Sequence, residues 1–395
     1  MKAIGLKTEY LFQPMTLSIT KPRFFWNCEG GIKQTAYQII AEREGEIIWD
    51  SGKVMSNKMT HIYYEGKPLQ SRDRVDWSVK LWDENGNEGE WVSSWFEMGL
   101  LNEEDWKAKW ITGNYKPQKN IRYPVDCFKK EFTIAKKIQK ARLYITACGL
   151  YEAKLNGKRV GEFCLAPGCT DYRYRLQYQS YDVTDLLIRE TNELEIQLAD
   201  GWYRGSIGCF GLTNVFGRET KLLCQLELTY EDGHIDTITS DDTFLWSNDG
   251  PIRFADLKDG EIYDASMVPS YSGFAKITTE KIVPTASNNV DAREHEVFTA
   301  KLITTPSGKK VLDFGQNIAG FLSFTVKGKK GQEIRLLCGE ILDEKGEFTQ
   351  ANIQVKKPAK EFGKLTEIKL ITGQESKIKG ELVPTPRQEI KFICS

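Results

Sequence analysis

Histidine is scarce in this sequence of 395 residues, which contains three: His61, His234 and His295. They lie far apart along the chain, no HExxH pair occurs, and none of the nine cysteines forms a CxxC pair. Protein zinc sites are typically built on such short spacings of histidine and cysteine. We therefore expect no metal site and no other cofactor in this chain, and we interpret His234 and His295 as surface residues.

Long hydrophobic runs and an excess of charge of one sign are also absent. No uninterrupted apolar stretch approaches the ~18 residues that indicate a membrane-spanning helix. The 54 Lys and Arg residues nearly balance the 55 Asp and Glu residues, whereas a nucleic-acid-binding domain usually carries a basic footprint. The sequence therefore predicts a protein that binds neither membranes nor nucleic acids.

The cysteine pattern excludes a disulfide framework. The nine cysteines are odd in number and scattered, and some, such as Cys148 and Cys224, lie inside apolar, strand-like runs. Free cysteine behaves as a small buried hydrophobic residue. The N-terminal stretch MKAIGLKTEYLFQPMTL also lacks the apolar core and cleavage site of a secretory signal. We therefore expect a cytoplasmic protein.

Local motifs for nucleotide or nucleophilic chemistry are missing as well. The chain has no GxxxxGK[ST], no GxGxxG between a strand and a helix, and no GxSxG. A Ser-His-Asp or Cys-His site assembled from distant positions stays open. Acidic residues occur in the runs 240–242 and 256–264, but neither has the spacing diagnostic of a glycosidase carboxylate pair, which favours solvated turns.

Strand patterns dominate what is present. Segments 142–157, 194–200 and 222–230 alternate apolar with polar residues or are rich in β-branched and aromatic residues. Turn dipeptides such as Asn156-Gly157 separate them and supply the positive φ that tight hairpins need. Helical periodicity is confined to the short segments 102–110 and 183–187. The sequence predicts an all-β fold of tandem β-sandwiches.

Three segments are expected along the chain. Residues 1–102 contain about seven short, Trp-rich strands, which is typical of an immunoglobulin-like or fibronectin type III sandwich. Residues 103–298 hold a larger β-sandwich. Residues 299–395 begin a third run of strands that ends in the strand-like QEIKFICS, so we expect this last domain to be incomplete at its C-terminus.

The loop Asp200-Gly-Trp-Tyr-Arg-Gly205 is the most suggestive candidate for binding. Glycines on both sides allow a sharp turn that would present Trp202, Tyr203 and Arg204 outward. An aromatic ring can stack on the C–H face of a sugar, while Asp200 and Arg204 hydrogen-bond to its hydroxyls. The alternative is that Trp202 and Tyr203 form an inter-domain contact. Both interpretations stay open.

Several ordered motifs resemble the β-domains of bacterial α-L-rhamnosidases. The segments similar to the N-terminal β-domain of that family are 141–161, 165–172, 178–187, 199–205 and 259–265. The segments 311–320 and 339–343 resemble its concanavalin-like domain, and 49–53, 72–77 and 82–86 resemble the fibronectin-like module that often precedes both. Cys169 departs from the pattern, because the family usually has Trp there. The resemblance implies a jelly-roll or galactose-binding-like second sandwich and a partial concanavalin-like third one.

The resemblance also implies a function. Such enzymes release terminal α-L-rhamnose with inversion, using two carboxylates on an (α/α) toroid that follows the β-domains. No position in this chain matches those carboxylates, so we expect no catalytic residue here and a chain that is inactive alone. The implied partners are rhamnosylated glycans or glycosides and a catalytic toroid, in cis or in trans. Asp200, Trp202, Tyr203, Arg204 and Glu261 are the expected substrate-wall or interface residues.

Two other readings belong to different functional classes. The chain could be a free-standing carbohydrate-binding or accessory β-sandwich protein, which the loop 200–205 motivates. It could also be a structural partner that docks a separately encoded catalytic chain. Within the third segment, Asp313 and Asn317 are expected to hold a tight turn through side-chain-to-backbone hydrogen bonds rather than to contact sugar.

Overall fold

The computed structural model describes residues 1–118, 121–208, 212–326, 333–351, 367–371 and 376–380. Within these ranges nearly all regular structure is β-strand, and helical structure is limited to the four-residue α1 (Gly201–Arg204) and the 3-10 turns η1 (Glu103–Asp105) and η2 (Thr184–Leu186). The predicted all-β class of tandem sandwiches is confirmed. No helix among the described residues is long and apolar enough to cross a membrane.

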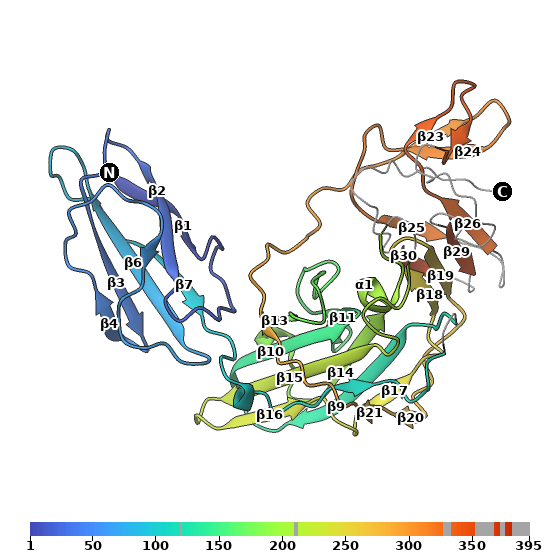
Figure 1. Ribbon diagram of the computed structural model, residues 1–395, viewed down its shortest axis with the longest axis horizontal. Coiled ribbons are helices and arrows are strands. Elements are labelled where there is room, and N and C mark those ends of the chain that lie inside the picture. Colours follow the sequence, from blue (N-terminus) through green and yellow to red (C-terminus); the bar gives the residue numbers. More distant parts are fainter. Residues whose placement is uncertain (119–120, 209–211, 327–332, 352–366, 372–375, 381–395) are drawn as a thin grey trace.

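The first sandwich, on the left in Figure 1, consists of two antiparallel sheets. One has the order β1-β2-β5, with β1 (Lys2–Thr8), β2 (Arg23–Glu29) and β5 (Ile62–Tyr63). The other has the order β4-β3-β6-β7, with β4 (Glu46–Asp50), β3 (Ala36–Arg43), β6 (Arg74–Trp82) and β7 (Val92–Glu97). Along β6, alternate residues point inward, so that Val75, Trp77 and Val79 join the core between the sheets.

The second sandwich is larger and packs two sheets face to face, one of them antiparallel throughout and the other antiparallel except for the parallel pair β13–β22. One sheet has the order β21-β8-β15-β10-β13-β22, with β16 on β15: β21 (Lys276–Ile277), β8 (Ile111–Thr112), β15 (Lys221–Tyr230), β10 (Ile138–Cys148), β13 (Gln177–Asp182), β22 (Thr285–Ala286) and β16 (Ile235–Thr239). The other has the order β12-β11-β14-β9-β17-β20: β12 (Lys158–Arg159), β11 (Leu150–Leu155), β14 (Glu190–Ala199), β9 (Asp126–Ile134), β17 (Leu245–Ser247) and β20 (Gly273–Phe274). Leu194, Ile196 and Leu198 of β14 alternate into the shared core.

Strand β10 is buried on both of its faces. Leu143 and Ile145 lie in the core between the two sheets. On the opposite face, Tyr144 packs with Leu100, and Cys148 packs with Trp110. The outer face of this strand is therefore covered by the segment that leaves the first sandwich, which explains why residues 143–148 of β10 are apolar except for Thr146.

Residues 102–110 were expected to form a helix, and this prediction is wrong beyond Asp105. Trp106, Ala108 and Trp110 pack on the outer face of the sheet, while the backbone N–H groups of Lys107 and Ala108 donate to the side-chain oxygen of Gln225 at 2.6 and 3.3 Å. Apolar residues at every second position suit an extended segment that lies on a sheet. The tertiary contact therefore overrides the weak helical propensity.

The third group of strands includes a hairpin that comes from the second segment of the chain. Strands β18 (Ile252–Asp256) and β19 (Gly260–Asp264) join β29 (Glu367–Ile371) and β26 (Glu333–Leu337) in a four-stranded sheet of order β18-β19-β29-β26. Three two-stranded ribbons complete this region: β23 (Lys301–Thr304) with β24 (Lys310–Asp313), β25 (Leu322–Val326) with β30 (Ser376–Gly380), and β27 (Ile341–Leu342) with β28 (Phe348–Thr349). The hairpin thus ties the second and third groups of strands together.

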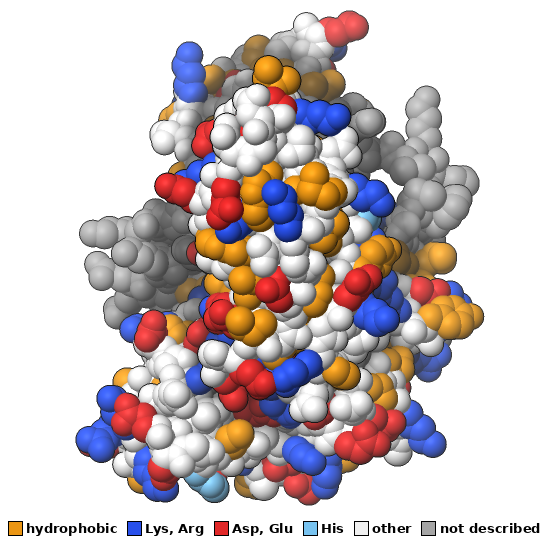
Figure 2. All heavy atoms as spheres, turned by 90° about the vertical axis from the view of Figure 1, so that its left-hand side faces the viewer, with side chains coloured by type: hydrophobic (Ala, Val, Ile, Leu, Met, Phe, Trp, Pro, Cys, Tyr) orange, Lys and Arg blue, Asp and Glu red, His pale blue; other side chains and the backbone are white. Residues whose placement is uncertain are grey.

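The surface of the first sandwich is mixed in character. Figure 2 faces the side of the molecule that lies on the left in Figure 1. Acidic and basic side chains are interspersed with apolar ones over this face, and neither charge gathers into a broad patch.

Candidate functional site

Helix α1 and its N-cap contain four of the five residues predicted to bind substrate or form an interface: Asp200, Trp202, Tyr203 and Arg204. The turn into the helix depends on Gly201, whose φ is +52°. A Cβ at this position would lie 2.5 Å from Cγ of Leu150 on β11. Glycine is therefore needed both for the left-handed backbone and for the close approach to the neighbouring strand.

The sequence predicts that the side chains of this loop point outward, but not all of them do. Arg204 is 4% exposed and Tyr203 is 6% exposed. The Tyr203 ring meets Tyr172 edge-on, with centroids 5.3 Å apart, and Trp202 packs partly buried against the same cluster. The prediction of outward presentation is wrong for Tyr203 and Arg204, because each finds a partner inside the second sandwich. A role of the loop in sugar contact or at an interface stays a prediction.

Arg204 enters a buried polar cluster centred on Asp126. The Asp126 carboxylate is fully buried and accepts hydrogen bonds from Trp246 Nε1 at 3.0 Å, Thr220 Oγ1 at 2.8 Å and Tyr115 Oη at 3.2 Å. Arg204 Nη2 lies 4.0 Å from the same carboxylate. Burial raises the pKa of Asp126, whereas Arg204 and the three donors act to lower it.

A second arginine, Arg122, ties the α1 loop to the β18–β19 hairpin. Its guanidinium contacts Asp256 at 3.0 Å, Asp259 at 2.7 Å and Asp200 at 3.4 Å, and it donates to Ser206 Oγ at 2.9 Å. The Asp256 side chain also accepts the backbone N–H of Ser206 at 2.7 Å. The loop and the hairpin are therefore held together by one cation surrounded by three carboxylates.

A cavity of about 650 Å³ opens beside this network, between strands β11 and β14 and the β18–β19 hairpin. Gly201 of the loop and Glu261, the fifth predicted residue, both line it. Its walls combine aromatic, acidic and basic side chains; among them are Tyr151, Glu152, Lys154, Arg159, Gln197, Asp256, Glu261, Tyr263, Glu294 and Phe321. The structure therefore places Glu261 close to the α1 loop, although 56 or more residues separate them in sequence.

The charges of the cavity wall are partly neutralised within it. Arg159 lies 3.6 Å from Glu152 and 3.8 Å from Glu294. A wall of this kind can hydrogen-bond to a hydroxylated ligand and can offer Tyr263 and Phe321 as apolar surface. In the described part of the chain no three His, Cys, Asp or Glu side chains are arranged to hold a metal ion.

Sequence reasoning missed Arg122 and Asp126, which organise this region. Arg122 lies in an irregular segment, and its carboxylate partners follow it by 78 to 137 residues. No local motif marks such a contact, so no signal in the single sequence could have found it. The prediction for Asp313 is confirmed, since its Oδ1 accepts the backbone N–H of Gly315 at 2.9 Å.

Three family models match the chain in sequence order. Residues 3–102 match the Rha78A-like N-terminal immunoglobulin domain, and residues 136–304 match the α-L-rhamnosidase N-terminal domain. Residues 303–377 match the bacterial α-L-rhamnosidase concanavalin-like domain. The chain carries the N-terminal β-domains of the α-L-rhamnosidase family. The matched N-terminal domain corresponds to the second sandwich, and the matched concanavalin-like domain corresponds to the third group of strands.

Individual α-L-rhamnosidases are similar over most of this chain. One from Formosa agariphila is 34% identical over 370 residues, covering 86% of this chain and 40% of the relative. One from Alteromonas sp. is 32% identical over 382 residues, covering 89% of this chain and 41% of the relative. The crystal structure of the native enzyme from Aspergillus terreus superposes with a TM-score of 0.89 at 29% identity, covering 98% of this chain and 46% of that one. The chain thus spans about two fifths of the length of these curated relatives.

Proposed function

We propose that this chain is the non-catalytic N-terminal portion of an α-L-rhamnosidase, a glycoside hydrolase that releases terminal α-L-rhamnose with inversion. The order of the three family matches carries the proposal, because an immunoglobulin-like, a rhamnosidase N-terminal and a concanavalin-like domain follow one another here. The corresponding units are the predicted segments 1–102, 103–298 and 299–395. The substrates of the whole enzyme are rhamnosylated glycans or glycosides.

The chemistry of the whole enzyme belongs to a separate catalytic unit. An inverting glycosidase needs a carboxylic acid to protonate the leaving oxygen and a carboxylate, roughly 6.5–9.5 Å away, to activate water on the opposite face of the sugar. The Arg122 network engages Asp200, Asp256 and Asp259 in ion pairs, which does not suit them to that task. The β-domains instead brace an (α/α) toroid, present in cis or in trans.

Hydrolysis of an aryl α-L-rhamnoside tests this proposal. We expect the purified, folded chain to release no aryl alcohol above the buffer rate, while a full-length α-L-rhamnosidase serves as the positive control. Addition of the toroid of a related rhamnosidase as a separate chain is expected to restore turnover if the two parts associate. Turnover that co-purifies with this chain alone and scales with its concentration would overturn the proposal.

The cavity beside α1 supports a second candidate, a carbohydrate-binding role for the chain on its own. A ligand that binds only the folded state raises the melting temperature by mass action, so L-rhamnose is expected to stabilise the chain in a concentration-dependent way. Glu261→Ala is expected to remove that shift, whereas Glu65→Ala, on an exposed carboxylate of the first sandwich, should preserve it. An identical shift in the two variants would count against the cavity.

A further inference from the structure

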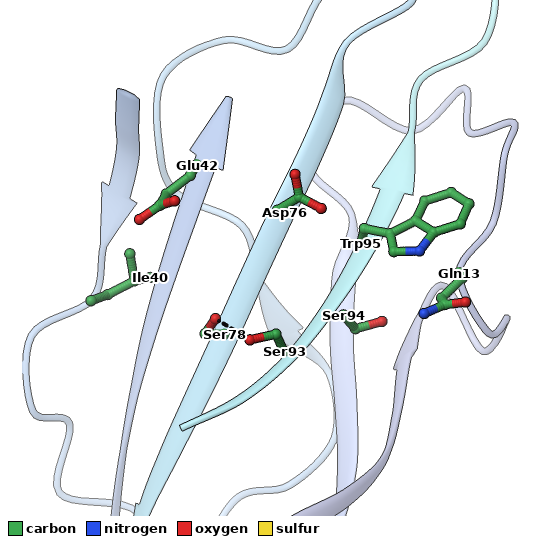
Figure 3. Close-up of a pocket in the computed structure, with 8 residues that line it drawn as sticks. All are labelled: Gln13, Ile40, Glu42, Asp76, Ser78, Ser93, Ser94 and Trp95. Atoms are coloured by element: carbon green, nitrogen blue, oxygen red, sulfur yellow. Dashed lines mark hydrogen bonds between the residues drawn. The ribbon is translucent and has the colours of Figure 1, made fainter. Parts of the chain in front are cut away.

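The first sandwich has a polar hollow of its own on the outer face of the sheet β4-β3-β6-β7 (Figure 3). Its volume is about 260 Å³. Strands β3, β6 and β7 and the segment before β2 contribute its lining residues, which are Gln13, Ile40, Glu42, Asp76, Ser78, Ser93, Ser94 and Trp95. The hollow lies in the segment 3–102, which is separate from the residues that line the cavity beside α1.

Strand register places these side chains in two rows across the sheet. Glu42, Asp76 and Trp95 are direct cross-strand partners in one row. Ser78 and Ser93 are partners in the next, and their hydroxyl oxygens lie 2.8 Å apart (Figure 3). An aromatic ring, two carboxylates and two hydroxyls are therefore neighbours on one solvent-facing area of the sheet.

The acidic pair in this hollow is not explained by folding. Like charges directly opposite each other destabilise a sheet, yet Glu42 stands opposite Asp76. Asp76 has Arg74 at 3.5 Å, whereas Glu42 has no hydrogen-bond or ion-pair partner among the described residues. At the rim, Gln13 has a φ of +43°, a strained conformation for a residue other than glycine. The Glu42 carboxylate therefore remains available to accept hydrogen bonds from a ligand.

The indole of Trp95 is held in place before any ligand arrives. The Arg74 guanidinium lies 3.8 Å from the ring centroid and is itself fixed by Glu97 at 3.3 Å. This cation–π contact holds the indole in one orientation, and the part of the ring that Arg74 does not cover lines the hollow. A fixed aromatic surface beside hydrogen-bond acceptors is what recognition of a ring with one apolar C–H face and several hydroxyls requires.

A second indole extends the same face. Trp91 is 39% exposed and carries Lys80 4.8 Å above its ring. Lys80 and Ser78 are alternate residues of β6 and share one face, so the Trp91 ring beneath Lys80 lies on the same side of the sheet as the hollow.

We propose that this hollow binds a neutral sugar unit of a glycan, stacked on Trp95 and hydrogen-bonded through its hydroxyls to Glu42, Asp76 and the two serines. The volume falls below the roughly 300–1,000 Å³ of sites for drug-sized ligands, which suits one sugar ring. The unpaired Glu42 disfavours anionic ligands such as uronates, and six polar residues among the eight that line the hollow disfavour an apolar ligand. The proposal goes beyond rhamnoside hydrolysis, because it concerns a binding site on the first sandwich.

Indole NMR signals of the full chain provide the test. The chain has 10 tryptophans, and the Trp95 signal is assigned by its loss in Trp95→Phe. The probes are methyl α-L-rhamnoside, methyl β-D-glucoside and methyl α-D-galactoside, with D-galacturonate as the acidic counterpart. We expect a saturable shift of the Trp95 signal with at least one neutral glycoside and no shift with galacturonate. The absence of any shift up to about 50 mM, an affinity weaker than about 2 kcal/mol, would overturn the proposal.

Variants then separate a built site from incidental contact. Glu42→Ala changes an exposed side chain, so the variant should fold normally. Its dissociation constant for the glycoside should rise about tenfold, which corresponds to about 1.4 kcal/mol. Glu65→Ala, the matched exposed carboxylate of the same sandwich, should leave it unchanged. Equal affinity in the two variants would contradict the assignment. Hydrolysis plays no part in this binding experiment. A negative binding result is therefore distinguishable from a failure of the proposed function.

Discussion

Glu97, the last residue of β7, and Arg142 on β10 form a bidentate ion pair that joins the first sandwich to the second. Arg142 Nε lies 2.9 Å from Glu97 Oε2, and Nη2 lies 2.8 Å from Oε1. The side chains are only 7% and 4% exposed. Both charges are withdrawn from water, and although Asp182 also contacts Arg142 and Lys140 also contacts Glu97, the bidentate pair is the contact that fastens the two sandwiches together.

Removal of one partner of this pair should therefore be strongly destabilising. Arg142→Ala leaves the buried Glu97 carboxylate without its main counter-charge, and we expect the free energy of unfolding to fall by about 3–5 kcal/mol. Urea unfolding followed by tryptophan fluorescence measures the change. Arg173→Ala, at a side chain that is 64% exposed, is the control and should stay within about 0.5 kcal/mol. A loss below about 1 kcal/mol for Arg142→Ala would contradict the buried pair.

The same junction should weaken in acid through Asp105. Burial acts to raise the pKa of Asp105, but hydrogen bonds from Ser71 and Arg72 outweigh it and lower this pKa from 3.8 to about 2. A carboxyl group whose pKa is lower in the folded state stabilises that state above its unfolded pKa, and this contribution is lost as the pH falls toward the folded value.

We therefore expect the stability of the chain to decrease between about pH 4 and pH 2, with Asp105 contributing to the slope. Asp105→Asn should flatten this part of the curve of melting temperature against pH. Asp185→Asn, at an exposed carboxylate of the second sandwich, serves as the comparison and should leave the curve unchanged. Parallel curves for the Asp105 variant and the unmodified chain would refute the assignment.

A third prediction concerns the close contact at Gly99. A Cβ at this position would lie 2.1 Å from Oη of Tyr178, which accepts the backbone N–H of Leu100 at 2.6 Å. Gly99→Ala should destabilise the chain by about 1–3 kcal/mol through overpacking. The double variant Gly99→Ala with Tyr178→Phe removes the clashing oxygen, so its loss should be smaller than the sum of the single losses. Additive losses would show that the clash does not occur.

Arg204 provides a fourth prediction, within the second sandwich. Arg204→Ala leaves the buried Asp126 and Asp200 without their nearest cation, and a loss of about 3–5 kcal/mol in unfolding free energy is expected. Arg204→Lys keeps the charge but not the fork that reaches Asp200 and Tyr115, so its loss should be intermediate. Thermal unfolding of the two variants measures both losses. If Arg204→Ala leaves the unfolding free energy unchanged, the loop is held by the packing of Tyr203 instead.

Local signals in the sequence predicted local structure well. Asn156-Gly157 was expected to form a tight turn, and its φ values of +53° and +74° connect β11 to β12 with Lys154 opposite Arg159. The alternation of Leu194, Ile196 and Leu198 likewise indicated a strand with one buried face. Both signals act over a few residues, within which the backbone has few other choices.

The direction of side chains in the candidate site was not predictable in the same way. The residues of the loop 200–205 were identified, and Glu261 was placed among them, but their partners come from distant segments. Arg204 meets Asp126 and Tyr115, and Asp200 meets Arg122, all of which lie 74 or more residues earlier in the chain. Nothing in the local pattern distinguishes an arginine that points into a sandwich from one that points into solvent.

By itself the sequence determined the all-β class, the turns and the family, because alternation, Asn-Gly dipeptides and ordered motifs are local properties. Only the tertiary structure decided that residues 106–110 are extended and that Arg204 is buried. It also decided that the β18–β19 hairpin pairs with β29 and that Glu42, Asp76 and Trp95 share one row of a sheet. These outcomes depend on which strands become neighbours, and that is set by burial of the whole chain rather than by any single segment.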